Sequence, residues 1–276
     1  MTDSVPDSLL AAKEELLQQV RTMNLFNDTF TAVVFKDEGS CRHLVRELMQ
    51  NPTLELIDFR TQDDIPQLLN RSPRLDIVAQ DDKGILYEIE VQRLEEPAPA
   101  RRVRFYTSVM DSELLRKGVD YDKLPEVYLF YISEEDIWRK GRTKYEVQQV
   151  LGYGNEAIPY DNGLHTIYVN AEIDDGTSLA KLMQYLKTAE AGDTSQGDLS
   201  QYVNNLKYAE GGREKMGEFE RYYREEGRKT GEASGQLKER LKNIKALMTN
   251  MKVSAQEAMK MLSVPPEEQE KLLSLL

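Results

Sequence analysis

The sequence contains very little cysteine or histidine. Its 276 residues include one cysteine, Cys41, and two histidines, His43 and His165. A single cysteine excludes an internal disulfide, so we expect a reducing, cytoplasmic setting. So few sulfur and imidazole ligands also argue against a zinc site. No motif pairs a histidine with a serine or cysteine nucleophile, and the sequence has no glycine-rich nucleotide-binding loop.

Long hydrophobic runs and an excess of basic residues are absent as well. No window approaches the roughly 20 apolar residues needed to span a bilayer, and the first residues do not resemble a signal peptide. We therefore expect no membrane association. The formal net charge of −12 argues against a protein that coats nucleic acid by bulk attraction. It is still compatible with a local basic patch, or with acids that a metal ion neutralises.

The composition is that of a globular protein with long polar helices, since 40% of the residues are hydrophobic and 30% are charged. Helices alternate with strands over roughly residues 25–190, which predicts an α/β core with a mixed central sheet flanked by helices. Apolar periodicity and capping residues such as Ser40 predict the individual elements. The predicted helices span 8–22, 40–50, 101–118 (ended by Gly118) and 177–190, and the predicted strands span 53–60, 125–132 and 165–171.

The remainder of the chain predicts a helical tail. We expect an α/β domain over residues 1–190, a charged helical linker over 191–236 and a small helical module over 237–276. In the module, Ser254 and Glu257 have the spacing of a capping box.

Gly227, Gly231 and Gly235 recur every four residues of this tail, on one face of a helix. One interpretation is a weak connecting helix, because each glycine costs about 1 kcal/mol relative to alanine. The other is close packing against a second helix, in a homodimer formed through the C-terminal helices.

Residues 74–92, "RLDIVAQDDKGILYEIEVQ", predict a β-hairpin. A three-residue loop, 82–84, places glycine at the position that requires a left-handed backbone. This register pairs Val78 with Glu88 and Asp76 with Glu90. One face of the hairpin is then wholly apolar and packs into the core. The other face gathers acidic and polar side chains, namely Asp76, Gln80, Glu88, Glu90 and Gln92.

Paired acids on one sheet face repel each other unless a cation lies between them. The Cβ atoms of Asp76 and Glu90 would be roughly 5 Å apart, a separation at which like charges destabilise a sheet. Mg²⁺ and similar hard ions bind carboxylate oxygens and would reverse the effect. The alternative is an ordinary amphipathic hairpin with a solvated acidic face.

The stretch "LDIVAQDDKGILYEIEVQ" resembles the PD-(D/E)XK nuclease superfamily, in which an Asp on one strand precedes Glu-x-Lys or Glu-x-Gln on the next. It is most similar to the transposase-associated, recombination-promoting nuclease branch. The following "RRVRFYTSVMDSELLRKGVDYDKLPEVYLFYI" is similar to the Arg- and Tyr-bearing helix and apolar strand of that branch. The resemblance implies a restriction-endonuclease-like fold.

The resemblance also implies residue roles. Asp76 and Glu90, helped by the carbonyl of Val91, would bind Mg²⁺ or Mn²⁺. Gln92 takes the place of the catalytic lysine and offers only neutral hydrogen bonds. Glu88 points the same way, either as an extra ligand or base or as a solvated strand residue.

Helical residues complete the predicted site. Arg102 and Tyr106 are one turn apart and would face the substrate together, and Arg101 and Arg104 lie beside them. The alternative is a solvated helix face with Tyr106 in the core. Glu47 would either join the acids or lie at the surface.

Two functions follow from this reading. The first is a divalent-metal-dependent DNA endonuclease serving recombination, mobile elements or defence. The second is a catalytically degenerate nuclease fold that acts as a protein-interaction module.

Overall fold

The computed structural model describes most of the chain, in two compact units, Met1–Phe219 and Glu220–Leu276. Asp76 and Gly118 lie outside the described residues, so the metal-binding role of Asp76 and the helix end at Gly118 stay predictions. None of the described helices combines the length and the apolar character needed to cross a lipid bilayer. The described residues are 7–61, 77–93, 99–115, 120–153, 156–262, 264–265, 269, 272–273 and 275–276.

A six-stranded mixed sheet forms the centre of the first unit, in the order β1-β2-β3-β4-β8-β5. Strands β3, β4 and β8 run parallel to one another, whereas β1–β2, β2–β3 and β5–β8 are antiparallel pairs. The mixed α/β sheet predicted from the sequence is thus confirmed. Its strands are β1 (Leu56–Thr61), β2 (Ile77–Asp81), β3 (Leu86–Gln92), β4 (Val127–Ser133), β5 (Lys144–Glu146) and β8 (Leu164–Asn170).

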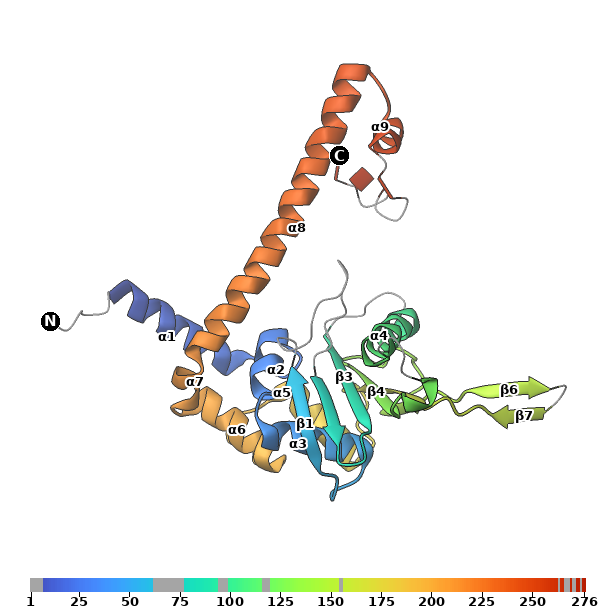
Figure 1. Ribbon diagram of the computed structural model, residues 1–276. Helices are drawn as coiled ribbons and strands as arrows, with labels where there is room; N and C mark the ends of the chain where they lie inside the picture. The colour runs from blue at the N-terminus through green and yellow to red at the C-terminus, as the bar shows by residue number, and fades with distance from the viewer. Residues whose placement is uncertain are drawn as a thin grey trace. The chain divides into compact units, whose positions relative to one another are not determined.

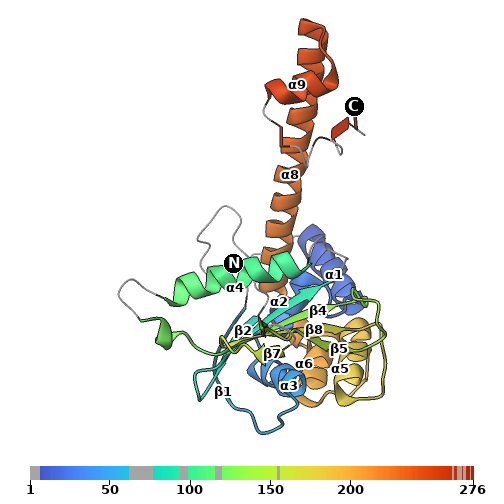
Figure 2. The ribbon, with the colours of Figure 1, turned by 90° about the vertical axis from the view of Figure 1, so that its right-hand side faces the viewer.

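Helices cover both faces of this sheet. Helix α4 (Pro99–Leu114) lies over one face, and α3 (Glu38–Met49), α5 (Ser178–Thr188) and α6 (Gly197–Tyr208) lie over the other (Figure 2). Helix α4 begins two residues before the predicted start, because proline suits the first helical position. The remaining helices of this unit are α1 (Asp7–Thr22), α2 (Asp28–Val34), α7 (Gly211–Glu214) and the 3₁₀ turn Tyr121–Lys123.

Helix α3 is capped by Asp37, and the expectation that Ser40 caps it is wrong. The Asp37 carboxylate accepts hydrogen bonds from the Ser40 amide at 2.8 Å and from the Ser40 hydroxyl at 2.9 Å. A carboxylate at the N-cap satisfies a free amide of the first turn and also interacts favourably with the helix dipole. The helix therefore starts at Glu38, two residues before the predicted start.

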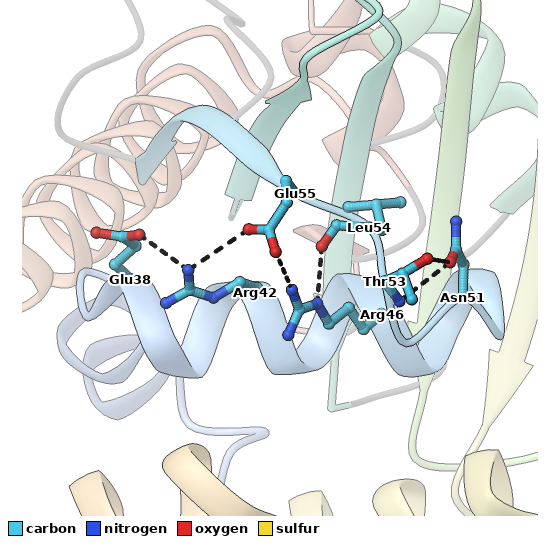
Figure 3. Close-up of polar contacts among 7 residues, drawn as sticks. All are labelled: Glu38, Arg42, Arg46, Asn51, Thr53, Leu54 and Glu55. Carbon is cyan, nitrogen blue, oxygen red and sulfur yellow. Dashed lines mark hydrogen bonds and ion pairs between the residues drawn. The ribbon is translucent and has the colours of Figure 1, made fainter.

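Two arginines of α3 fasten the start of β1 to this helix (Figure 3). Arg46 donates to the Leu54 carbonyl at 2.7 Å and pairs with Glu55 at 2.7 Å. Arg42 lies 3.2 Å from Glu38 and 3.7 Å from Glu55. These contacts hold the edge strand β1, which pairs with the first strand of the β2–β3 hairpin.

The hairpin β2–β3 has the predicted register. Val78 lies opposite Glu88, and Ile77 lies opposite Ile89. The Asp81 amide donates to the Ile85 carbonyl at 3.1 Å, and Gly84 has φ +84°, so the three-residue loop is confirmed. A glycine is needed there because a side chain strains this backbone conformation.

A second, two-stranded sheet was missed by the sequence reasoning. It consists of β6 (Val150–Tyr153) and β7 (Glu156–Pro159), and Figure 1 shows it extending away from the main sheet. Strands of three or four residues give too short an alternation to detect, which also explains why β5 was missed.

The second unit is helical. Most of α8 (Met216–Met251) belongs to it, together with α9 (Ala255–Met261). The predicted capping box of Ser254 and Glu257 is confirmed. A small core unites these helices and is formed by Ile244, Ala258, Met259, Val264 and Leu272.

The compact units divide at a different place from the predicted domains. The structural boundary falls after Phe219, and α6, within the predicted linker, buries Leu199, Val203 and Leu206 in the first unit.

Candidate active site

Strand β3 is buried on both faces. It lies between β2 and β4 in the sheet, and α4, which lies over one face, contacts Glu90 through Arg102 and Tyr106. As a result Glu88 is 0% exposed and Glu90 is 1% exposed. The interpretation of this hairpin as one with a solvated acidic face is therefore wrong. The helix residues that cover the face are apolar or aromatic, chiefly Val103, Tyr106 and Met110.

Side chains from the strand and the helix converge on one oxygen of Glu90. Its Oε1 accepts hydrogen bonds from Gln92 Nε2 at 2.5 Å, from Arg102 Nη2 at 2.9 Å and from the Tyr106 hydroxyl at 3.2 Å. Arg102 Nε also donates to the Tyr106 oxygen at 2.5 Å. A buried carboxylate requires such compensation, and charge-assisted hydrogen bonds are the strongest kind available.

The spacing along each element explains this convergence. Glu90 and Gln92 are two residues apart on a strand and so share a face, whereas Arg102 and Tyr106 are four apart on a helix. Arg102 and Tyr106 lie together, as their spacing predicts, and Tyr106 is also part of the buried core. Arg101 and Arg104 are exposed, on the outer side of the helix.

Tyr106 acts as a neutral hydrogen-bond donor. Burial raises the pKa of its hydroxyl, and the negative charge of Glu90 raises it further, whereas Arg102 lowers it. The net shift is upward, so the phenol keeps its proton at neutral pH. It can orient Glu90 but does not supply a base.

Glu88 is buried without compensation. Neither carboxyl oxygen has a hydrogen-bond partner among the described residues. Its neighbours in the sheet register are Val78 and Leu129, both apolar. Burial raises the pKa of Glu88 to about 8, and the charge of Asp111 adds to the shift. The interpretation of Glu88 as a solvated strand residue is therefore wrong.

The remaining predicted residues are placed as follows. Val91 is buried on β3 with its side chain on the face opposite Glu90. Glu47 is half-buried on α3, which covers the other face of the sheet from α4. Within the described part of the chain, no group of three or more His, Cys, Asp or Glu side chains could hold a metal ion.

The sequence reasoning missed one neighbour of the site. The Gln92 carbonyl accepts from the Glu134 amide at 3.2 Å, so the loop after β4 begins beside the site. This loop contains Trp138, Arg139, Lys140 and Arg142. The signal was available, because four of the seven residues from Trp138 to Lys144 are basic in a chain of net charge −12.

The fold and the comparisons together give the class. A mixed six-stranded sheet flanked by helices is consistent with a restriction-endonuclease-like fold. The model of one family, described as PD-(D/E)XK nuclease family transposase, matches residues 52–211, more than half of the chain. The chain belongs to this family. Neither the curated proteins nor the solved structures gave a match.

Proposed function

We propose that the protein is a divalent-metal-dependent DNA endonuclease that hydrolyses backbone phosphodiesters in recombination, mobile elements or defence. The family supports a nuclease, and one observation in the site carries the proposal. Glu90, a nearly fully buried carboxylate, is held by an amide, a guanidinium and a phenol from two elements. A buried acid with this many donors argues for a role beyond packing, since an apolar side chain would be less costly there.

Asp76 and Glu90, with the carbonyl of Val91, would hold Mg²⁺ or Mn²⁺. The donor set fits these ions, because all three groups offer the oxygen ligands that hard cations prefer. When bound, the ion would polarise the scissile phosphate and lower the pKa of its water. Asp76 directly precedes Ile77, which lies opposite Ile89, so the predicted pairing of Asp76 with Glu90 continues the register of the described strands.

The other residues orient and bind. Gln92 stands where the superfamily has lysine, and its hydrogen bond to Glu90 makes it a positioning residue that fixes the carboxylate. Arg102 has 26% of its side chain exposed, and its planar guanidinium suits a phosphate of the substrate. Tyr106 would assist Arg102 through their shared hydrogen bond.

The test is a plasmid nicking assay with Mg²⁺ or Mn²⁺, run with the wild-type chain and Asp76→Ala. We expect metal-dependent nicking by the wild type, its loss with EDTA, and a strong reduction in Asp76→Ala. Equal nicking by the two forms would refute the role of Asp76.

The second candidate is a degenerate nuclease fold that serves as a protein-interaction module. Two points favour it: the resemblance implies that Gln92 takes the place of the lysine, and Arg102 pairs with Glu90 at 2.9 Å. Calorimetric titration with Mn²⁺ separates the candidates. Heat of binding that disappears in Asp76→Ala supports the endonuclease, and its absence from the wild type supports the interaction module.

We also propose that the C-terminal helices form a homodimer. Gly227, Gly231 and Gly235 are exposed on α8, and a Cβ added at each would meet no described atom within 4 Å. A second helix could therefore approach this face closely. Sedimentation of the full chain is expected to give a dimer, and Gly231→Leu to give a monomer; a monomeric wild type would contradict the proposal.

A further inference from the structure

The loop between β4 and β5 is a basic stretch of the first unit that is exposed to solvent. Trp138, Arg139, Lys140 and Arg142 are all exposed, and we call residues 138–142 the basic loop. Lys144 follows it but is paired with Glu146 at 2.7 Å. Among the described residues, no carboxylate forms an ion pair with Lys140 or Arg142. These cations are therefore available to an anionic partner.

The backbone of the basic loop is fixed from within by Asp136. This buried carboxylate accepts hydrogen bonds from the amides of Arg139 at 3.0 Å, Lys140 at 3.0 Å and Gly141 at 2.8 Å. The Tyr145 hydroxyl donates to it as well, at 2.8 Å. The loop thus holds its cationic side chains outward on a rigid base, which lowers the entropy lost when a ligand binds.

Two further features show that the loop conformation is specified rather than incidental. Asn170 on β8 donates to the Arg142 carbonyl at 2.7 Å, which ties the loop to the sheet. Arg139 has φ +52°, a left-handed conformation that residues other than glycine rarely adopt. Such outliers persist where the surrounding structure over-determines them, and they are concentrated at functional sites.

A row of aromatic side chains links the basic loop to the candidate active site. Tyr131 on β4 lies in register with Glu90, and its ring is 5.6 Å from that of Tyr168 on β8. The Trp138 ring then contacts Tyr168 edge-on at 5.1 Å. Adjacent strands are about 4.8 Å apart, so Trp138 lies roughly 15 Å from Glu90 on the same face of the sheet.

We propose that the basic loop binds the phosphate backbone of the DNA substrate a few nucleotides from the phosphate that is cleaved. The inference rests on the proposed function and extends it to a substrate-binding surface. Successive nucleotides of one strand advance about 3.4 Å along the duplex axis, so roughly 15 Å corresponds to four or five nucleotides. Arg139, Lys140 and Arg142 would contact phosphates there, and Trp138 would pack against the sugar-phosphate backbone.

The charge of the whole protein makes a local surface of this kind necessary. A chain of net charge −12 repels DNA at long range, so binding requires cations gathered at one place. Arg102 offers one such group at the site. The basic loop adds Lys140 and Arg142 at the same end of the sheet, because the chain that leads to it begins at Glu134, whose amide donates to the Gln92 carbonyl.

The first experiment measures DNA binding by fluorescence anisotropy, with a labelled duplex and Ca²⁺ in place of Mg²⁺. The test variant carries Arg139→Gln, Lys140→Gln and Arg142→Gln. The matched control carries Lys181→Gln, Lys187→Gln and Arg213→Gln, which remove the same charge from exposed positions elsewhere in this unit. Thermal unfolding checks that both variants fold.

The expected result is a loss of affinity of about tenfold or more in the loop variant and little change in the control. The slope of log K against log salt concentration should become shallower by about 2 to 3, because each phosphate contact contributes about 0.9. An unchanged affinity and slope in the loop variant would overturn the inference, as would a wild-type chain that binds no DNA.

A second readout comes from Trp138, which is the sole tryptophan of the chain. Its fluorescence is expected to be quenched or shifted when the duplex is added, and the titration should give the same affinity as the anisotropy. Emission that stays constant while anisotropy rises would place the DNA elsewhere and overturn the inference.

These experiments separate the inference from the proposed function. Loop-dependent DNA binding without metal-dependent nicking would sustain the basic loop and reject the endonuclease. If nicking depends on Asp76 but DNA affinity is unchanged by the loop substitutions, the endonuclease proposal is supported and the proposal that the basic loop binds DNA is rejected.

Discussion

Two regions of the first unit bury carboxylates: strand β3 buries Glu88 and Glu90, and the loop after β4 buries Asp136. They differ in the hydrogen-bond donors that surround these carboxylates. Asp136 is 6% exposed, and Glu88 and Glu90 are at most 1% exposed. Burial alone would raise the pKa of Asp136, but hydrogen bonds from the Gly141 amide, the Tyr145 hydroxyl and two further amides lower it. Glu88 has no such donors among the described residues, and its pKa is raised to about 8.

The backbone explains the difference between the two regions. In a central strand the amides are already engaged in the sheet, so a carboxylate there can obtain donors only from side chains. Glu90 obtains them from α4 and from Gln92, whereas Glu88 faces apolar neighbours. In the loop, free amides surround Asp136. The comparison therefore explains why Asp136 has a structural role, and it agrees with the role proposed for Glu90.

The largest effect is expected from Glu90→Gln, measured as the rate of plasmid nicking. If Glu90 holds the metal ion as proposed, its loss removes several kcal/mol of transition-state stabilisation, so the rate should fall on the order of 10²–10³-fold. This substitution also removes the carboxylate that pairs with Arg102. The double variant Glu90→Gln/Arg102→Gln changes both members of this ion pair and serves as the control for stability. A double variant that nicks at the wild-type rate would contradict the assignment.

The next largest effect is expected from Asp136→Ala, measured by urea unfolding. The substitution leaves several amides of the loop without their acceptor, and we expect a loss of about 3 kcal/mol in the free energy of unfolding. Asp136→Asn keeps an acceptor and should cost less. If Asp136→Ala unfolds at the same urea concentration as the wild type, the structural role assigned to Asp136 is wrong.

The pH dependence of stability tests whether the charged form of Asp136 stabilises the protein. The folded pKa of Asp136 is lower than its unfolded pKa, so its charged form stabilises the protein above about pH 4. This contribution should be lost as the pH falls through the lower, folded value. The stability difference between the wild type and Asp136→Asn should therefore shrink in acid, which unfolding at a series of pH values would measure.

The sequence predicts contacts between residues that are close in the chain better than contacts between distant elements. The hairpin register followed from a local turn, and Gly84 and the Val78–Glu88 pair are where it placed them. The convergence of Arg102 with Tyr106 followed from helical spacing. The burial of Glu88 and Glu90 could not be predicted from the local sequence, because it depends on where α4 packs across the sheet. The role of Asp136 was hidden for the same reason, since its donors are loop amides that carry no sequence signal.

The smallest effect, and the sharpest test of the site, is expected from Gln92→Lys. This change introduces the residue type that the resemblance to the superfamily implies at this position, and it adds a positive charge that can stabilise a developing negative charge on phosphate. If the protein is an endonuclease, we expect nicking to rise by up to about tenfold.

Gln92→Met is the matched control for this change. It removes the hydrogen bond to Glu90 without adding charge and should slow nicking. A Gln92→Lys variant slower than the wild type would mean that the amide is needed as an orienting donor and that Arg102 already supplies the cation. If the wild type and both variants all lack measurable nicking, the degenerate fold is favoured, because a lysine at position 92 would then not produce activity.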